Sequence, residues 1–163
     1  MKKQLLWQAV VGICLILPAA GVYAQDTTFK TLPSVTVTAT SKVSHDVAKA
    51  FEASFPDAEN PAWYKLDKNY LVKFMTKDQS NRALYKNNGM LIYHIRYGHE
   101  QNLPDDVRKI VKSSYYDYSI MSVIYVNQDQ RDIWVVNVED SQKIILVRVE
   151  NGEIEEVEKY NKS

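Results

Sequence analysis

The sequence has few of the residues from which reactive or metal-binding sites are commonly built. It contains one cysteine, three histidines, five glycines and five prolines among 163 residues. A single cysteine, Cys14, excludes an intrachain disulfide and any metal site with several thiolate ligands. The glycines form no phosphate-binding loop, and no serine lies in a Gly-x-Ser-x-Gly motif. These absences argue against most familiar catalytic sites.

The first 24 residues have the three-part layout of a secretory signal peptide. Lys2 and Lys3 form a basic start, residues 9–17 are apolar, and a small-x-small end closes at Ala24. The apolar run is shorter than the ~20 residues that a membrane-spanning helix needs. We therefore predict cleavage after Ala24, a periplasmic or secreted location and no membrane span in the mature chain. A retained N-terminal anchor is the alternative.

Charge is balanced in the whole chain. Lysine and arginine together number 20, as do aspartate and glutamate, and loss of Lys2 and Lys3 with the leader changes the formal net charge from 0 to −2. No run of basic residues stands out from this balance. Nucleic-acid binding therefore has no electrostatic basis, and we expect no such partner.

Two segments have the apolar spacing of amphipathic helices. Residues 25–43 come first and are predicted to be a flexible tether, although the alternation of residues 35–38 would also suit an edge strand. The first helix is expected to start after Ser44 and to end at Pro56, and the second to start at Pro104. Apolar residues then recur every four positions, at Val47, Phe51 and Phe55 in the first helix and at Val107, Val111 and Tyr115 in the second.

Alternating strands follow each predicted helix. The dipeptides Asn88-Gly89 and Asn151-Gly152 each join two apolar-rich runs, which predicts hairpins with type I′ turns. The shared order of helix, strands and Asn-Gly turn suggests a duplicated unit. We therefore predict an α+β domain of two tandem helix-plus-antiparallel-meander units, residues 44–100 and 101–160. The helices are expected to pack on one face of the sheets, whether these are separate or joined.

The histidines give no sign of an active site. His94 and His99 are five residues apart and His45 lies near the first helix cap, so none has the spacing of a zinc-binding helix. No catalytic, cofactor-binding or metal-binding residue is therefore predicted. A small enzyme with a His-carboxylate site stays the alternative, and it requires these histidines to converge with a carboxylate.

Tyrosine is the abundant residue, with 11 in the chain. Most are expected in or beside the core, because aromatic residues suit strands. A tyrosine that stays exposed offers contact area and a hydroxyl group at low entropic cost. Within residues 91–98 we therefore select Tyr93, His94, Arg96 and Tyr97 as candidate partner-binding residues.

Several of these landmarks together resemble the PepSY-like, β-lactamase-inhibitor-like exported proteins of Bacteroidetes. The matching pattern runs Phe51-x3-Phe55-Pro56-x-Ala58-x4-Trp63, then Tyr70-x-Val72-x-Phe74, Tyr85-x3-Gly89 and Leu103-Pro104-x2-Val107-x3-Val111-x3-Tyr115. The resemblance covers residues 44–160. It implies tandem helix-and-sheet units outside the cytoplasm, and it supplies no catalytic residues.

These features lead to one functional hypothesis. We expect a non-catalytic exported module, binding or inhibitory, that uses an exposed β-sheet face and needs no cofactor. Its partner would be an unidentified protein or peptide. A structural protein of the cell envelope is a further alternative, alongside the small enzyme.

Overall fold

Strands make up most of the structure. The computed structural model describes residues 36–40 and 42–162. The elements in chain order are β1 (Val37–Ala39), α1 (His45–Ser54), β2 (Glu59–Leu66), β3 (Asn69–Thr76), β4 (Gln79–Lys86), β5 (Leu91–Gly98), the 3-10 helix η1 (Glu100–Asn102), α2 (Asp105–Ser114), β6 (Ser119–Gln128), β7 (Arg131–Glu139), β8 (Lys143–Glu150) and β9 (Glu153–Asn161). The predicted leader lies outside the described residues. Within the predicted tether, Val37–Ala39 form the edge strand that the alternation had allowed.

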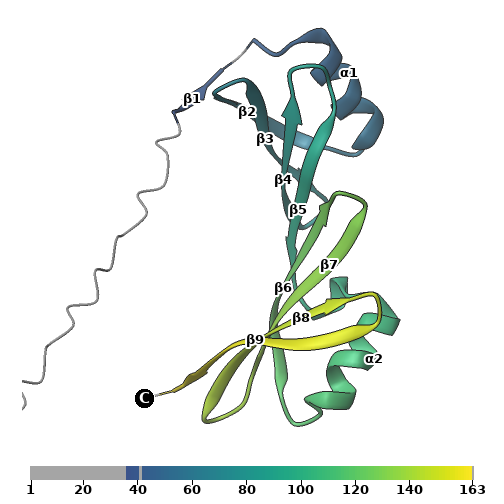
Figure 1. Ribbon diagram of the computed structural model, residues 1–163, viewed down its shortest axis with the longest axis vertical. Helices are drawn as coiled ribbons and strands as arrows, with labels where there is room; N and C mark the ends of the chain where they lie inside the picture. The colour runs from purple at the N-terminus through teal and green to yellow at the C-terminus, as the bar shows by residue number, and fades with distance from the viewer. Residues whose placement is uncertain (1–35, 41, 163) are drawn as a thin grey trace, which may run out of the picture. The chain divides into compact units, whose positions relative to one another are not determined.

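All nine strands belong to one antiparallel sheet, in the order β1 to β9 (Figure 1). The prediction of an α+β fold with two tandem helix-plus-meander units is therefore wrong, because the fold is dominated by a single sheet with only two α-helices in the described chain. The physical reason is the pairing of β5 with β6, from Tyr93 opposite Gln128 to Gly98 opposite Val123. Backbone groups on the outer edge of β5 thus pair with β6, so the strands continue across residue 100 as one long sheet in which the helices are a small part.

Helix α1 starts and ends where the sequence predicts. The Ser44 side chain accepts a hydrogen bond from the Val47 backbone N–H at 3.4 Å, and Pro56 follows the helix. Val47 and Phe51 are buried against strand residues of one cluster. The strand residues of this N-terminal cluster are Tyr70, Val72, Phe74, Ala83 and Tyr85.

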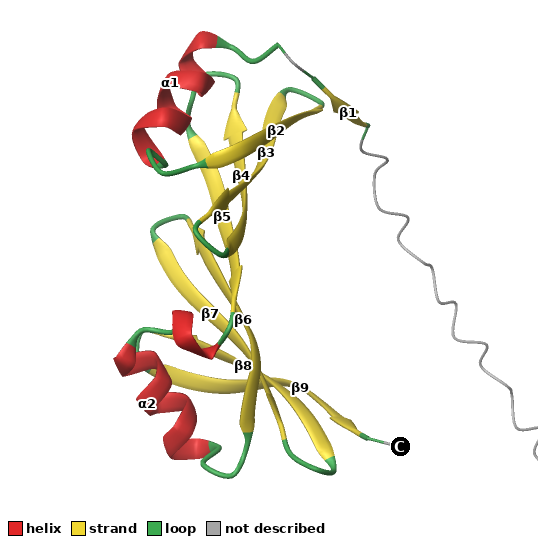
Figure 2. Cartoon of the chain, turned by 180° about the vertical axis from the view of Figure 1, so that it is seen from behind, coloured by secondary structure: helices red, strands yellow, loops and turns green. Residues whose placement is uncertain are grey.

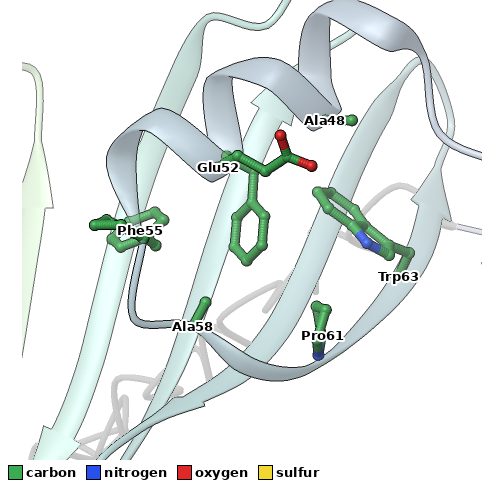
Figure 3. Close-up of a pocket in the computed structure, with 8 residues that line it drawn as sticks. Ala48, Glu52, Phe55, Ala58, Pro61 and Trp63 are labelled. Atoms are coloured by element: carbon green, nitrogen blue, oxygen red, sulfur yellow. The ribbon is translucent and has the colours of Figure 1, made fainter.

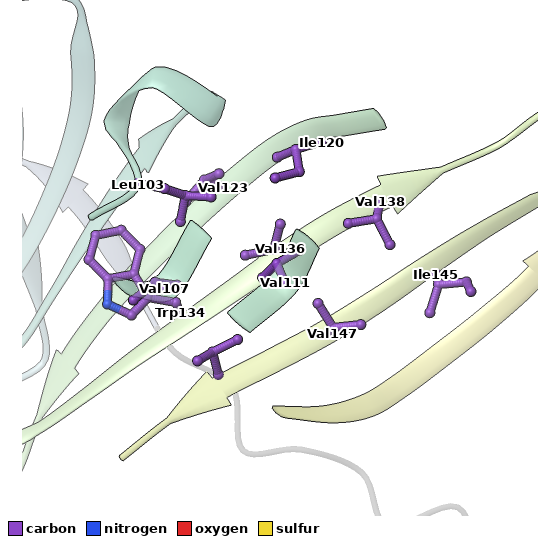
Figure 4. Packing of buried hydrophobic residues seen from close by; sticks show 11 residues of the cluster. Leu103, Val107, Val111, Ile120, Val123, Trp134, Val136, Val138, Ile145 and Val147 are labelled. Atoms are coloured by element: carbon purple, nitrogen blue, oxygen red, sulfur yellow. The ribbon is translucent and has the colours of Figure 1, made fainter. Parts of the chain in front are cut away.

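Helix α2 covers a second cluster on the later strands. Pro104 is its N-cap, so the helix begins at Asp105, one residue later than predicted. Asp105 and Asp106 lie in its first turn. Its buried residues Val107 and Val111 pack against a group of strand side chains (Figure 4). The strand residues of this C-terminal cluster are Ile120, Val123, Trp134, Val136, Val138, Ile145, Val147 and Val149.

The sheet therefore has two different faces. Figure 2 shows both helices on the same side of the strands, which we call the covered face. Side chains alternate along a strand, so the neighbours of the buried residues point to the opposite side, which we call the open face. By the strand register, the open face of β3–β7 includes Leu71, Lys73, Met75, Ser80, Arg82, Leu84, Tyr93, Ile95, Tyr97, Ile124, Val126, Gln128, Arg131, Ile133 and Val135.

The two Asn-Gly turns differ from each other. Asn151 and Gly152 both have positive φ, at 52° and 82°, as the predicted type I′ turn requires. At the earlier hairpin only Gly89 does, at 81°, and its N–H donates to the Lys86 carbonyl at 3.0 Å. Because the strand register also shifts after Leu84, the type I′ prediction is wrong for this hairpin, which has a bulged, longer loop.

Candidate functional site

Strand β5 divides the four predicted partner-binding residues between the two faces. Tyr93 pairs with Leu84, so it lies on the open face, and Tyr97 lies on that face four residues later. His94 pairs with Ala83, which is buried beneath α1, so His94 and Arg96 lie on the covered face. The structure therefore brings the tyrosines together and separates them from the other pair. All four side chains are half-buried.

Two cations lie opposite each other in the centre of the open face. Lys73 on β3 pairs directly with Arg82 on β4. The Lys73 ammonium lies 4.8 Å from the centre of the Tyr64 ring, and the Arg82 guanidinium lies 5.1 Å from that of Tyr97. Like charges placed directly opposite across two strands are destabilising, and the tyrosine rings offset part of this cost.

No carboxylate within the described chain neutralises these cations. Every ion pair found there joins other residues, on β7, β8, β9 and the C-terminal end. Burial raises the pKa of Tyr93, an effect that the nearby positive charge of Arg82 reduces. The open face of β2–β5 is thus a tyrosine-rich surface with two positive charges that form no ion pair in the described chain. We call it the basic tyrosine surface: Tyr64, Lys73, Arg82, Tyr93 and Tyr97.

On the covered face, His94 takes part in a buried polar network. Its Nε2 lies 2.9 Å from Oδ1 of Asn81, a residue that is 1% exposed. The Asn81 amide donates to the Gln79 carbonyl, which fixes the amide orientation, so the proton between Asn81 and His94 belongs to the histidine. Burial, with a smaller effect of Arg96, lowers the pKa of His94 to about 4. His94 is therefore a neutral hydrogen-bond donor at physiological pH.

Arg96 packs against two aromatic residues of the C-terminal cluster. Its guanidinium is 4.8 Å from the ring centre of Tyr125 and 5.9 Å from that of Trp134. The Tyr125 hydroxyl donates to Asp132 at 2.5 Å, and burial together with this bond raises the pKa of Tyr125 to about 12. Arg96 therefore packs on the covered face against Tyr125 and Trp134, which sets it apart from the tyrosines of the open face.

The histidines do not assemble an active site. His45 is exposed at the start of α1, His99 is exposed between β5 and η1, and His94 bonds to Asn81. In residues 36–40 and 42–162, no group of three His, Cys, Asp or Glu side chains is arranged to hold a metal ion. No helix of that part of the chain is long and apolar enough to cross a membrane.

A separate pocket of about 280 Å3 opens between α1 and β2 (Figure 3). Phe51, Phe55 and Trp63 supply its aromatic walls, and the centres of the Phe51 and Trp63 rings lie 5.2 Å apart with their planes at 75°. In the view of Figure 3, the Glu52 carboxylate extends from the helix toward Trp63. Ala48, Pro56, Ala58 and Pro61 complete the apolar lining.

Solved structures share this fold. A BLIP-like protein from Bacteroides fragilis has a TM-score of 0.57 and 17% identity, over 74% of this chain and 86% of that one. A DUF2874 family protein from Bacteroides ovatus has a TM-score of 0.56 and 16% identity, over 75% and 89%. A candidate periplasmic protein from Bacteroides eggerthii gives 0.54 and 16%, over 74% and 89%.

These likenesses establish the fold, and at such identities they establish nothing further. The β-lactamase-inhibitor-like part of the predicted resemblance is supported at the level of the fold by the Bacteroides fragilis protein. The PepSY part is not supported by these structures. No protein-family model matches the sequence, and no curated protein matches it.

Sequence reasoning selected the two tyrosines and missed the cations beside them. Lys73 and Arg82 were not among the candidate residues, because their pairing depends on the register of β3 against β4. The two residues are nine positions apart around a tight turn. Counting positions outward from the turn at residues 77 and 78 would have placed them opposite each other.

Proposed function

We propose that the protein is a non-catalytic exported module that binds an acidic protein or peptide through the basic tyrosine surface. The observation that carries this proposal is the facing pair of Lys73 and Arg82, which has no carboxylate partner in the described chain. Such a pair costs stability in the free protein. A carboxylate of a partner would remove that cost on binding.

The composition around the two cations also favours recognition. Tyr93 and Tyr97 flank them on the next strand, and half-buried leucine and isoleucine side chains lie between. Tyrosine and arginine are enriched among the residues that contribute most to protein interfaces. Because no helix of the described chain covers this face, a partner can reach the tyrosine rings and both cations together.

Location outside the cytoplasm is part of the proposal. The leader layout at residues 1–24 supports export. The structural neighbour from Bacteroides eggerthii is itself described as a candidate periplasmic protein. An envelope location would bring the open face into contact with exported proteins and peptides.

The test is capture from the native cell envelope followed by binding measurements with the recovered partner. The first variant combines Lys73→Gln and Arg82→Gln, and the second combines Tyr93→Ser and Tyr97→Ser. Lys49→Gln on α1 is the matched control, because Lys49 is exposed and lies on the opposite side of the sheet. Melting midpoints of all variants are measured first.

We expect both surface variants to lose binding and the control to keep it. Binding should also weaken as salt rises, because screening acts over about 10 Å at 0.1 M. Full binding by both surface variants would exclude this face. A large fall in melting midpoint for the tyrosine variant would instead assign Tyr93 and Tyr97 to the folding core, and the charge variant would then decide the question alone.

A further inference from the structure

The pocket between α1 and β2 has the chemistry of a cation site. We propose that it binds a quaternary ammonium group, such as that of choline, with the positive charge between the aromatic walls and Glu52. This site is formed by α1, β2 and the loop between them, and it involves none of the residues of the basic tyrosine surface. It is independent of the proposed function, and its ligand is a small cation instead of an acidic partner.

The aromatic walls give the first argument. Phe51 is only 6% exposed and forms the inner wall, with the Trp63 ring nearly perpendicular to it and the Phe55 ring inclined at 47°. Phe51 and Trp63 are in edge-to-face contact, so a ligand does not fit between these two rings, and the half-buried Trp63 and Phe55 rings instead present their remaining faces to the pocket. A cation attracted to such faces is the functional use of cation–π contacts in ammonium recognition.

Charge gives the second argument. Glu52 is the only ionisable residue that lines the pocket, and it forms no ion pair in the described chain. Its carboxylate extends from α1 toward Trp63 (Figure 3). A single negative charge at the rim of an apolar cavity complements a single positive charge on an apolar ligand.

The lining also discriminates between kinds of cation. A primary ammonium has three N–H donors and holds its water strongly. Apart from Glu52, the side chains of the pocket offer no acceptor for those donors. A quaternary ammonium has no N–H group, and its methyl groups can pack against Ala48, Ala58 and Pro61. The volume of about 280 Å3 leaves room for the chain that carries the ammonium group.

The experiment follows the Trp63 indole N–H by two-dimensional NMR while choline is added to the purified protein. Trp134 is an internal reference, because it is buried in the other cluster. The neutral isostere 3,3-dimethylbutan-1-ol tests the role of charge, and butylammonium tests the preference for a quaternary group. Glu52→Gln removes the carboxylate, whereas Glu59→Gln removes an exposed carboxylate of β2 outside the pocket.

We expect a saturable shift of the Trp63 signal with choline and no shift of Trp134. The neutral isostere and butylammonium should each bind about tenfold more weakly, and Glu52→Gln should weaken choline binding by a similar factor. Glu59→Gln should leave it unchanged. Equal binding of choline and its isostere, equal loss in both glutamate variants, or no choline shift at 50 mM would each overturn the proposal.

Discussion

Replacement of Gly89 by alanine tests the contact between the β4–β5 hairpin and α1. Gly89 has a φ of 81°, and a Cβ atom added there would lie 2.7 Å from the Asp46 carbonyl oxygen. Gly152 has almost the same φ, 82°, but an added Cβ would meet nothing within 4 Å. The two variants therefore share the cost of a left-handed backbone and differ in the steric clash.

The expected losses of stability follow from the left-handed backbone and from the steric clash. A left-handed residue with a side chain costs about 1–2 kcal/mol, and the lower entropy of the unfolded alanine chain returns about 0.4–1 kcal/mol. Gly152→Ala should therefore lower the free energy of unfolding by about 1 kcal/mol. Gly89→Ala should add the cost of overpacking against backbone, about 1–3 kcal/mol. We expect a total near 2–4 kcal/mol for Gly89→Ala.

Urea denaturation monitored by circular dichroism measures the free energy of unfolding of both variants. An unchanged m value shows that both variants expose the same surface on unfolding, so that their free energies can be compared. The nearby hydrogen bond from the Ser44 hydroxyl to the Asn87 carbonyl, at 3.0 Å, should also weaken in Gly89→Ala as the hairpin moves. Equal losses of stability in the two variants would refute the reasoning, because they would mean that α1 yields to the added methyl group without cost.

Three further predictions concern the core, pH and export. Phe51→Ala should destabilise the protein by about 3–5 kcal/mol, because it empties the centre of the N-terminal cluster; a loss below about 1 kcal/mol in chemical denaturation would contradict its burial. The folded-state pKa of His94, about 4, lies below its ordinary value of 6.5, so the unfolded chain binds a proton first as pH falls. Stability should therefore decline between pH 6.5 and 4, and His94→Gln should show a smaller decline in unfolding measured across that range. Mass spectrometry of the exported protein should find Gln25 as its first residue, and an intact Met1 in the mature pool would contradict cleavage after Ala24.

Local signals predicted local structure well. Ser44 and Pro56 defined α1 because a hydroxyl cap and a proline act within one helical turn. The apolar spacing also identified Val107 and Val111 as the buried residues of α2. Each of these features depends on contacts between residues that are close in sequence.

Features that depend on strand register could not be predicted in the same way. The pairing of β5 with β6 joins residues separated by two helices, and no pattern near Tyr93 or Gln128 specifies it. The division of the candidate residues Tyr93, His94, Arg96 and Tyr97 between two faces, by contrast, follows from local geometry. Successive residues of a strand point to opposite faces, so the alternation alone separates the tyrosines from the other pair.

The strictly sequential order of the sheet has a consequence for how the chain folds. Every strand pairs only with the strands before and after it in the sequence. Apart from β1–β2, whose connection contains α1, and β5–β6, whose connection contains η1 and α2, each pairing closes a loop of a few residues, so little chain entropy is lost at each step. Topologies rich in such local contacts fold fast. A chain that emerges with its N-terminal end first can therefore add one hairpin after another to the growing sheet before its last strand is available.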